Sequence, residues 1–448
     1  MTKPLCRFEG QMARKYIVEG GTNLQGEITI RGAKNAVTKE MVAALLAPGV
    51  SRLRNVPDIG DVDITRRVLE SLGCGVRHDA AAGTLEIDGS TLSTPEVPAE
   101  YSGLNRIPIL MVGPLLHRFG RAVVPMMGGC GIGERPIDFH LQGFESLGAK
   151  VEYHDGAYHF SAERLTGTRI TLPFPSVGAT ENLMMAAALA HGTTEIRNAA
   201  IEPEIVDLAL LLQAMGAIIS QETDRTWVIQ GVDSLRPADH RVLNDRIEAA
   251  SFAVSAVATG GDVFIRGADQ LHLLTFLNWL RRAGGEFDVK PDGIRFYGRD
   301  RKLKSIAAET GVHPGLMTDW QQPLVILLTQ ATGMSVIHET VYENRFGYVE
   351  ALNRMGAHIQ VFDECLGGKD CRFRHLGHRH SAVILGPTPL RGAEMEIPDL
   401  RAGFSYLVAA VLAKGKSTLT GVRYIERGYD HVVEKFRSLG ASIEVVEE

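Results

Sequence analysis

The sequence is poor in cysteine, in net positive charge and in long apolar runs, and each shortage excludes a class of protein. Five cysteines among 448 residues are odd in number and mostly far apart, which argues against a disulfide framework and for free thiols in a reducing compartment. The formal net charge of −6 argues against a bulk nucleic-acid or anionic-membrane binder. No apolar run reaches the roughly 18 residues of a membrane span, and residues 1–11 lack the apolar stretch of a signal peptide. These absences favour a cytoplasmic enzyme.

What is present is a repeat. The chain is long enough for two domains of about 200 residues each. One sequence pattern occurs six times. It consists of a helix-like run, a small turn, and a short β-branched stretch. We expect the turn glycines to cap their helices in the left-handed conformation; they are Gly73, Gly148, Gly216, Gly284, Gly356 and Gly440.

The residues around each copy of the pattern predict a unit of strand, helix, strand, helix and strand. Such a unit cannot bury its apolar faces alone. Three units per lobe predict two similar α/β domains with a boundary near residue 242.

An insertion interrupts the spacing of the repeat at residues 364–380, ECLGGKDCRFRHLGHRH, and we expect a long loop there. Its cysteines and histidines, which are Cys365, Cys371, His375, His378 and His380, are of the types that zinc prefers. Their spacing matches none of the usual paired-ligand patterns, so the sequence favours a solvated loop over a structural metal site.

Basic residues recur where predicted helices begin. Lys34 and Asn35 follow a strand and open a helix, and Arg106, Arg345 and Arg401 lie at the entries of apolar helices. One such cation could simply face solvent. Several in equivalent positions oppose the helix dipole unless an anion is bound among them, which predicts an anion site.

Three aspartates precede apolar helices, at Asp245, Asp319 and Asp399. The default interpretation of each is an N-cap that stabilises its helix by about 1 kcal/mol and needs no catalytic role.

Seven segments together resemble the UDP-N-acetylglucosamine 1-carboxyvinyltransferases, a family of enolpyruvyltransferases. They occur in the family's order, and the similarity runs from about Tyr16 to Val446. The segments are GAKNA (32–36), GGCGIGERPIDFH (128–140), PSVGATEN (175–182), EPEIVDLA (202–209), HPGLMTDWQ (313–321), ETVYENRF (339–346) and PDLRAG (398–403).

The resemblance implies a two-lobed, inside-out α/β barrel of six βαβαββ units, three per lobe, as in the EPSP synthase-like superfamily. It also implies that the chain crosses twice between lobes. The expected domains are residues 34–242, which carry the Cys130 loop, and residues 1–33 with 243–448, which carry the insertion.

The resemblance also implies the reaction, the first committed step of peptidoglycan precursor synthesis. The enolpyruvyl group of phosphoenolpyruvate is transferred to the 3′-hydroxyl of UDP-N-acetylglucosamine, and phosphate is released. By position, Lys34, Asn35, Arg135 and Arg401 match the phosphoenolpyruvate contacts, and Asp319 matches the carboxylate near the sugar hydroxyl, where it could accept the proton.

Cys130 aligns with the family's cysteine, which can protonate C3 and form a covalent adduct. Arg135 nearby favours the thiolate. Four glycines around it, Gly128, Gly129, Gly131 and Gly133, would let this segment close over the nucleotide.

The remaining contacts implied by the resemblance are with the uridine nucleotide. They are Arg106, Arg135, Pro136, Ile137, Asp138, Phe139, Phe174, Pro175, Ser176, Val177, Asp319 and Val341. The expected partners are these two small-molecule substrates, with no cofactor, no metal, no nucleic acid and no membrane.

Departures from the family pattern lie on the acceptor side, where Asn105 and Pro108 flank Arg106 and IEAASF occupies residues 247–252. An enolpyruvyltransferase acting on another nucleotide, such as UMP in a nucleoside-antibiotic pathway, is therefore the alternative. The shikimate-pathway enzyme fits less well, because GAKNA replaces its Gly-Ser-Lys-Ser start. A binding paralogue without turnover fits poorly, since Lys34, Cys130, Asp319 and Arg401 are all present.

Overall fold

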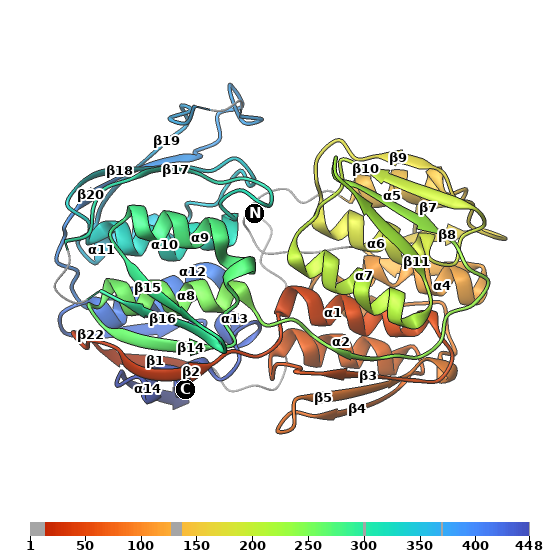
Figure 1. The fold of residues 1–448 in the computed structure, drawn as a ribbon, viewed down its shortest axis with the longest axis horizontal. Coiled ribbons are helices and arrows are strands. Elements are labelled where there is room, and N and C mark those ends of the chain that lie inside the picture. Colours follow the sequence, from red (N-terminus) through yellow and green to blue (C-terminus); the bar gives the residue numbers. More distant parts are fainter. Residues whose placement is uncertain (1–13, 127–136, 299–301, 369–370, 448) are drawn as a thin grey trace. The chain divides into compact units, whose positions relative to one another are not determined.

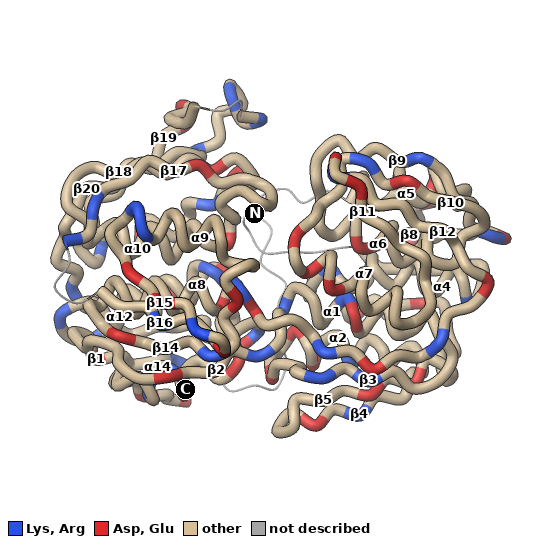
Figure 2. The backbone as a smooth tube through the Cα atoms, in the orientation of Figure 1, with Lys and Arg blue, Asp and Glu red and all other residues tan. Residues whose placement is uncertain are grey.

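A computed structural model describes residues 14–126, 137–298, 302–368 and 371–447 (Figure 1). The described chain divides into two compact units. Unit 1 holds residues 32–126 and 137–243, and unit 2 holds residues 14–31, 244–298, 302–368 and 371–447. Within each unit, basic and acidic residues are interspersed along the backbone (Figure 2). None of the helices in the described residues combines the length and apolar character needed to cross a bilayer.

Unit 1 carries three sheets. Their strand orders are β13-β3-β5-β4, β6-β8-β7 and β11-β12-β10-β9. The strands are β3 (Val50–Arg54), β4 (Gly75–Asp79), β5 (Thr84–Asp88), β6 (Arg121–Pro125), β7 (Lys150–His154), β8 (Ala157–Ser161), β9 (Arg169–Thr171), β10 (Thr193–Arg197), β11 (Ile218–Glu222), β12 (Thr226–Gln230) and β13 (Asp239–Arg241).

Unit 2 also carries three sheets. Their orders are β15-β16-β14-β2, β17-β18-β20-β19 and β21-β22-β1-β23. The strands are β1 (Arg14–Glu19), β2 (Gln25–Thr29), β14 (Asp262–Arg266), β15 (Glu286–Lys290), β16 (Gly293–Tyr297), β17 (Ala307–Glu309), β18 (Gly333–His338), β19 (His358–Phe362), β20 (Ser381–Gly386), β21 (Glu394–Glu396), β22 (Lys416–Thr420) and β23 (Ser442–Glu447).

Each unit contains seven helices in its described residues. In unit 1 they are α1 (Lys34–Ala43), α2 (Gly60–Ser71), α3 (Ile107–Leu110), α4 (Val112–Phe119), α5 (Asp138–Ser146), α6 (Val177–Ala187) and α7 (Pro203–Met215). In unit 2 they are α8 (Arg246–Ala258), α9 (Gln270–Arg282), α10 (Gln321–Thr329), α11 (Val349–Arg354), α12 (Leu400–Leu412), α13 (Arg423–Glu426) and α14 (Val432–Ser438). Short 3₁₀ turns are η1 (Ala44–Leu46), η2 (Gly89–Thr91), η3 (Ala99–Tyr101) and η4 (Thr318–Trp320).

Each unit is built with its most apolar helices inside and its sheets outside. In unit 2 every residue of α8 and α10 is buried, and these two helices and α12 pack on one another. The outer helix α9 is amphipathic instead. Its buried residues, Leu273, Phe276, Leu277 and Leu280, recur at helical spacing and face the core. This arrangement is the inside-out α/β barrel that the resemblance implied.

The six turn glycines confirm the repeat. Their φ angles lie between 91° and 111°, the left-handed region in which a side chain would be strained. Five of them are followed by two antiparallel strands, such as β4–β5 or β15–β16, and Gly440 is followed by β23, which pairs antiparallel with β1. Five of the six sheets in the described residues have four strands, one more than the residue pattern predicted, which matches the βαβαββ order implied by the resemblance; the sheet β6-β8-β7 has three.

Each unit has one edge strand that leads, along the chain, into a helix of the other unit. Strand β2 leads into α1 of unit 1, yet it pairs in parallel with β14 of unit 2. Strand β13 leads into α8 of unit 2, yet it pairs in parallel with β3 of unit 1. Strand β1 lies between β22 and β23 in its sheet, although these two partners are at the opposite end of the described chain.

The insertion lies between β19 and β20. Its described residues form turns without helix or strand, as predicted, and Figure 1 shows them extending beyond the sheet that contains β17 and β18.

Candidate functional site

Asp319 of unit 2 lies in η4 and contacts two buried arginines. Arg345 Nη2 donates to Asp319 Oδ1 at 2.5 Å, and Arg401 Nε lies 3.4 Å from Asp319 Oδ2. The arginines are 3% and 4% exposed. Burying guanidinium groups is costly unless they are paired, so the carboxylate holds both in place.

The three predicted cap aspartates differ in what they do. Asp245 accepts from the backbone N–H of Ile247 and Glu248, and Asp399 accepts from those of Arg401 and Ala402, so both cap their helices as predicted. For Asp319 the capping interpretation is wrong, because neither η4 nor α10 has a side-chain cap. Its carboxylate contacts Arg345 and Arg401 instead, unlike the carboxylates of Asp245 and Asp399.

Arg401 presents an unused donor. It lies in the first turn of α12, and its guanidinium stacks over Tyr429 at 5.3 Å. Among the described residues, its buried Nη1 has no hydrogen-bond partner. A buried donor of this kind costs free energy unless an acceptor reaches it, and an anionic ligand oxygen would serve.

Sequence reasoning missed two residues of this region. Glu339 is buried, and it accepts from Thr318 Oγ1 at 2.9 Å and from the Val341 N–H at 2.8 Å. It thereby ties η4 to Val341, a predicted nucleotide contact. Arg246 is buried at the start of α8, with its guanidinium 5.3 Å from the Trp320 ring. Only the ETVYENRF segment pointed to the first, and only the position after a cap aspartate pointed to the second.

Lys34 is the predicted anion-binding cation of unit 1. It is the first residue of α1, and its Nζ lies 2.9 Å from Oδ2 of Asp61, a buried residue of the first turn of α2. Asn35 follows it, partly buried, and its carbonyl accepts from Lys39 Nζ at 2.6 Å. Lys34 therefore opens α1 with its ammonium on the Asp61 carboxylate, and the anion site at this helix start stays a prediction.

His140 joins the segments that carry the predicted nucleotide contacts. It is buried on α5, and its Nδ1 lies 3.0 Å from Asn182 Nδ2 of α6. Asn182 Nδ2 also donates to the carbonyl of Ile109 in α3, at 2.9 Å. A Cβ on Gly178, in the first turn of α6, would lie 3.6 Å from the His140 ring.

The N-terminal ends of α5 and α6 therefore pack together, and α3 follows Arg106 directly. Ile137 is the buried residue before α5, Asp138 is exposed, and Phe139 is partly buried. Phe174, Pro175, Ser176 and Val177 are all partly exposed at the start of α6, where Ser176 is the N-cap. The predicted nucleotide contacts of this unit thus occupy neighbouring helix starts. Cys130, Arg135 and Pro136 lie outside the described residues.

His140 predicts a pH dependence of stability. Burial, and secondly the nearby Arg106 guanidinium, lower the pKa of His140 to about 3. Because the native state resists protonation, its stability is full above the unfolded-state pKa of about 6.5 and is lost as the pH falls, by about 2 kcal/mol at pH 5. His140→Gln should flatten the fall in melting temperature between pH 7 and pH 5. Exposed His191→Gln is the control, and parallel profiles for wild type and His140→Gln would contradict the assignment.

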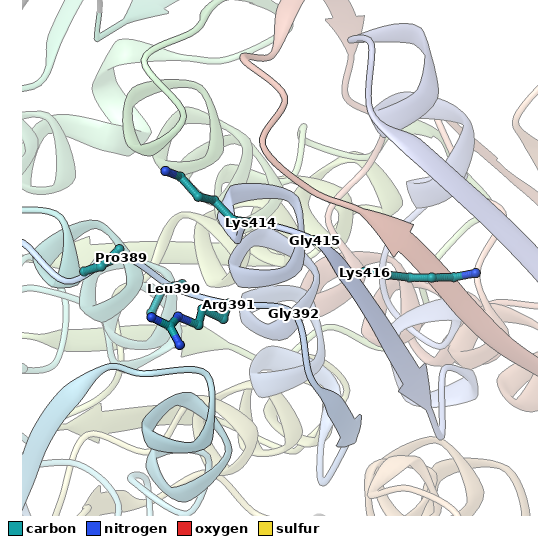
Figure 3. A pocket seen from close by; sticks show the side chains of 7 residues that line it. All are labelled: Pro389, Leu390, Arg391, Gly392, Lys414, Gly415 and Lys416. Carbon is teal, nitrogen blue, oxygen red and sulfur yellow. The ribbon is translucent and has the colours of Figure 1, made fainter.

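A basic pocket in unit 2 is a different feature. Pro389, Leu390, Gly392 and Gly415 line it together with Arg391, Lys414 and Lys416, and Figure 3 shows the two lysine side chains pointing apart. Arg401 lies in the first turn of α12 and Lys414 follows the end of that helix, so about 20 Å of helix separates them. Side chains that diverge at the far end of α12 do not contribute to the Asp319 region.

The sequence of the chain is similar to those of known proteins. Residues 18–436 match the family described as EPSP synthase (3-phosphoshikimate 1-carboxyvinyltransferase). The chain is 52% identical over 437 residues to a UDP-N-acetylglucosamine 1-carboxyvinyltransferase of Protochlamydia amoebophila, covering 96% of this chain and 94% of that protein. It is 43% identical to UDP-N-acetylglucosamine 1-carboxyvinyltransferase 1 of Halalkalibacterium halodurans, covering 97% and 95%.

Solved structures agree on the fold. The enolpyruvyl transferase NikO from Streptomyces tendae superposes with a TM-score of 0.85 at 25% identity, covering 98% of this chain and 100% of that chain. An EPSP synthase from Acinetobacter baumannii superposes with a TM-score of 0.75 at 19% identity, covering 97% and 100%.

Proposed function

Because the chain belongs to the UDP-N-acetylglucosamine 1-carboxyvinyltransferase family, we propose that it transfers the enolpyruvyl group of phosphoenolpyruvate to the 3′-hydroxyl of UDP-N-acetylglucosamine. Phosphate is the second product, and the reaction is the first committed step of peptidoglycan precursor synthesis. Family membership over nearly the full chain carries this proposal, and the Asp319 region supports it. The proposed compartment is the cytoplasm, which suits the free thiols of Cys74, Cys365 and Cys371.

The reaction has an addition step and an elimination step. In the addition, the 3′-oxygen bonds to C2 of phosphoenolpyruvate, the hydroxyl loses its proton, and C3 gains one. In the elimination, the C2–O bond to phosphate breaks and C3 loses a proton, which restores the double bond. The enzyme therefore needs cations for a phosphate and a carboxylate, a base for the hydroxyl, and an acid for C3.

We assign these roles as follows. Arg401 offers a buried guanidinium with an unused donor, and Lys34 offers an ammonium at a helix start, so both are suited to phosphoenolpyruvate. Asp319 is the base for the sugar hydroxyl, and its contacts with Arg345 and Arg401 hold the side chain in place. Cys130 is the acid for C3, and Arg135 and Asn35 complete the phosphoenolpyruvate contacts.

Val341, Arg106 and the starts of α5 and α6 are proposed to bind the uridine nucleotide. Val341 is fixed by Glu339, and the helix starts are fixed by His140 and Asn182. Backbone N–H groups at the first turns of α5 and α6 would face the diphosphate, as anions favour helix N-termini.

The acceptor is tested directly. We expect phosphate release from phosphoenolpyruvate with UDP-N-acetylglucosamine, and mass spectrometry should show the nucleotide sugar carrying an enolpyruvyl group. UMP and shikimate 3-phosphate are the comparison acceptors, and each should give less than about a hundredth of the rate, because acceptor choice depends on pocket contacts. Release with UMP alone would transfer the assignment to another acceptor.

A further inference from the structure

The insertion brings together four metal-ligating side chains in unit 2. His338 is the last residue of β18, Cys365 and Cys371 lie in the insertion, and His380 directly precedes β20. One ligand atom from each lies within 4.8 Å of those of the other three. Cys365 Sγ is 3.3 Å from His380 Nε2. Ligands of a tetrahedral zinc ion lie about 3.5 Å apart, given Zn–S and Zn–N bonds of about 2.3 and 2.0 Å.

We propose that His338, Cys365, Cys371 and His380 bind one Zn²⁺ ion in a structural site. Two thiolates and two imidazoles form a donor set that zinc favours over magnesium, calcium and manganese, which prefer oxygen. Four protein ligands complete a tetrahedron and leave no position for a substrate, so the ion has no direct part in the transfer reaction.

The hydrogen bonds of the histidines orient both rings for metal binding. His380 Nδ1 lies 2.5 Å from the carbonyl oxygen of His378, which can only accept, so Nδ1 carries the proton. Its Nε2 then has a lone pair, and this is the atom that faces Cys365. Such an outer hydrogen bond is what fixes the tautomer of a ligating histidine.

His338 is oriented by the same logic. Its Nδ1 lies 2.9 Å from Ser381 Oγ, and that hydroxyl already donates its one proton to the carbonyl of Glu364. His338 Nδ1 must therefore donate, which leaves the lone pair on Nε2. His338 is fully buried, and among the described residues its Nε2 has no hydrogen-bond partner. A buried acceptor without a partner is costly, and a metal ion beside two thiols would satisfy it.

The backbone of the insertion is shaped around this cluster. A Cβ on Gly367 would lie 2.4 Å from His338 Cδ2 and 2.8 Å from Glu309 Cδ, so glycine alone lets the chain pass over the ring. The Phe373 N–H points to Cys371 Sγ at 3.4 Å. Phe373 is buried against the His380 ring, with ring centroids 5.7 Å apart.

The site would fix the segment that carries Val341. Arg372, next to Cys371, donates to the carbonyl of Val341 and lies 3.7 Å from Glu343. On the other side, His338 precedes Glu339, which accepts from the Val341 N–H. Metal binding thus holds this segment from both sides. If the proposed function is correct, loss of zinc should raise KM for UDP-N-acetylglucosamine several-fold and leave kcat nearly unchanged.

The first experiment measures metal, not activity. Protein purified without a histidine tag or added metal should contain about one zinc per chain by plasma mass spectrometry, and X-ray absorption should show two sulfur and two nitrogen ligands. Cys365→Ser and Cys371→Ser should each lose most of the zinc. Cys74→Ser, at a buried cysteine of unit 1, and His375→Asn, at an exposed histidine of the insertion, should keep it.

Three results would overturn the proposal: wild type that neither contains zinc nor binds it when supplied, zinc that persists in both cysteine variants, or a Cys365–Cys371 disulfide in the isolated protein. A second measurement covers variants that fail to fold. A zinc chelator should lower the melting temperature of the wild type, and one equivalent of zinc should restore it, whereas Cys371→Ser should not respond. Because these readouts need no turnover, inactivity with UDP-N-acetylglucosamine would count against the proposed function and not against the zinc site.

Discussion

Asp319→Asn should lower kcat with phosphoenolpyruvate and UDP-N-acetylglucosamine by about 10²- to 10⁴-fold, the range for loss of a general base. The amide keeps the shape of the side chain and can still accept from Arg345 Nη2, but it cannot take the proton of the sugar hydroxyl. The purified variant should therefore fold and bind the nucleotide. Steady-state kinetics of phosphate release and calorimetric titration with UDP-N-acetylglucosamine check both parts.

Two further variants separate chemistry from packing. Asp319→Ala should also destabilise unit 2 by about 3 to 5 kcal/mol, because alanine, unlike asparagine, leaves the buried Arg345 and Arg401 without any acceptor from residue 319. Asp269→Asn is the matched control. Asp269 caps α9 from the surface, and asparagine caps as well as aspartate, so both turnover and stability should be preserved. Near-wild-type turnover in Asp319→Asn would remove Asp319 from the mechanism.

Lys34→Gln should lower kcat/KM for phosphoenolpyruvate by about 10²- to 10³-fold, the scale at which one electrostatic contact to a developing charge acts. The substitution removes the ammonium from the start of α1 and leaves the Asp61 carboxylate, which would repel an anionic substrate. Kinetics at varied phosphoenolpyruvate, with the acceptor saturating, measure this loss.

Its control is Lys150→Gln, which removes an exposed lysine of β7 whose partner is the exposed Glu152. That variant should keep wild-type kinetics, since exposed pairs contribute little. Equal kinetics of Lys34→Gln and Lys150→Gln would show that the start of α1 does not bind phosphoenolpyruvate.

The repeat could be predicted because its determinants are local. A glycine that ends a helix must accept a positive φ, and this requirement appears at the same place in each unit, from Gly73 to Gly440. The caps at Asp245 and Asp399 were equally predictable, since a cap contacts residues two and three positions ahead.

What the sequence could not show depends on contacts between distant segments. Asp319 looks like the other two cap aspartates, and only folding brings Arg345 and Arg401 to its carboxylate. The four proposed zinc ligands could not be recognised from the sequence for the same reason. Its fourth candidate ligand, His338, belongs to β18 and not to the insertion, so no spacing rule within residues 364–380 includes it.

The position of β1 has a consequence for synthesis on the ribosome. Residues 32–243 of unit 1 are nearly continuous in the chain, whereas β1 needs β22 and β23, which are translated last. At about 5 to 20 residues per second, the first strand emerges roughly 20 to 80 s before its partners exist. Its backbone donors and acceptors are open to other nascent chains during that time. Pairing of β1 is therefore a late step in the folding of this chain, because it has to wait for the synthesis of β22 and β23.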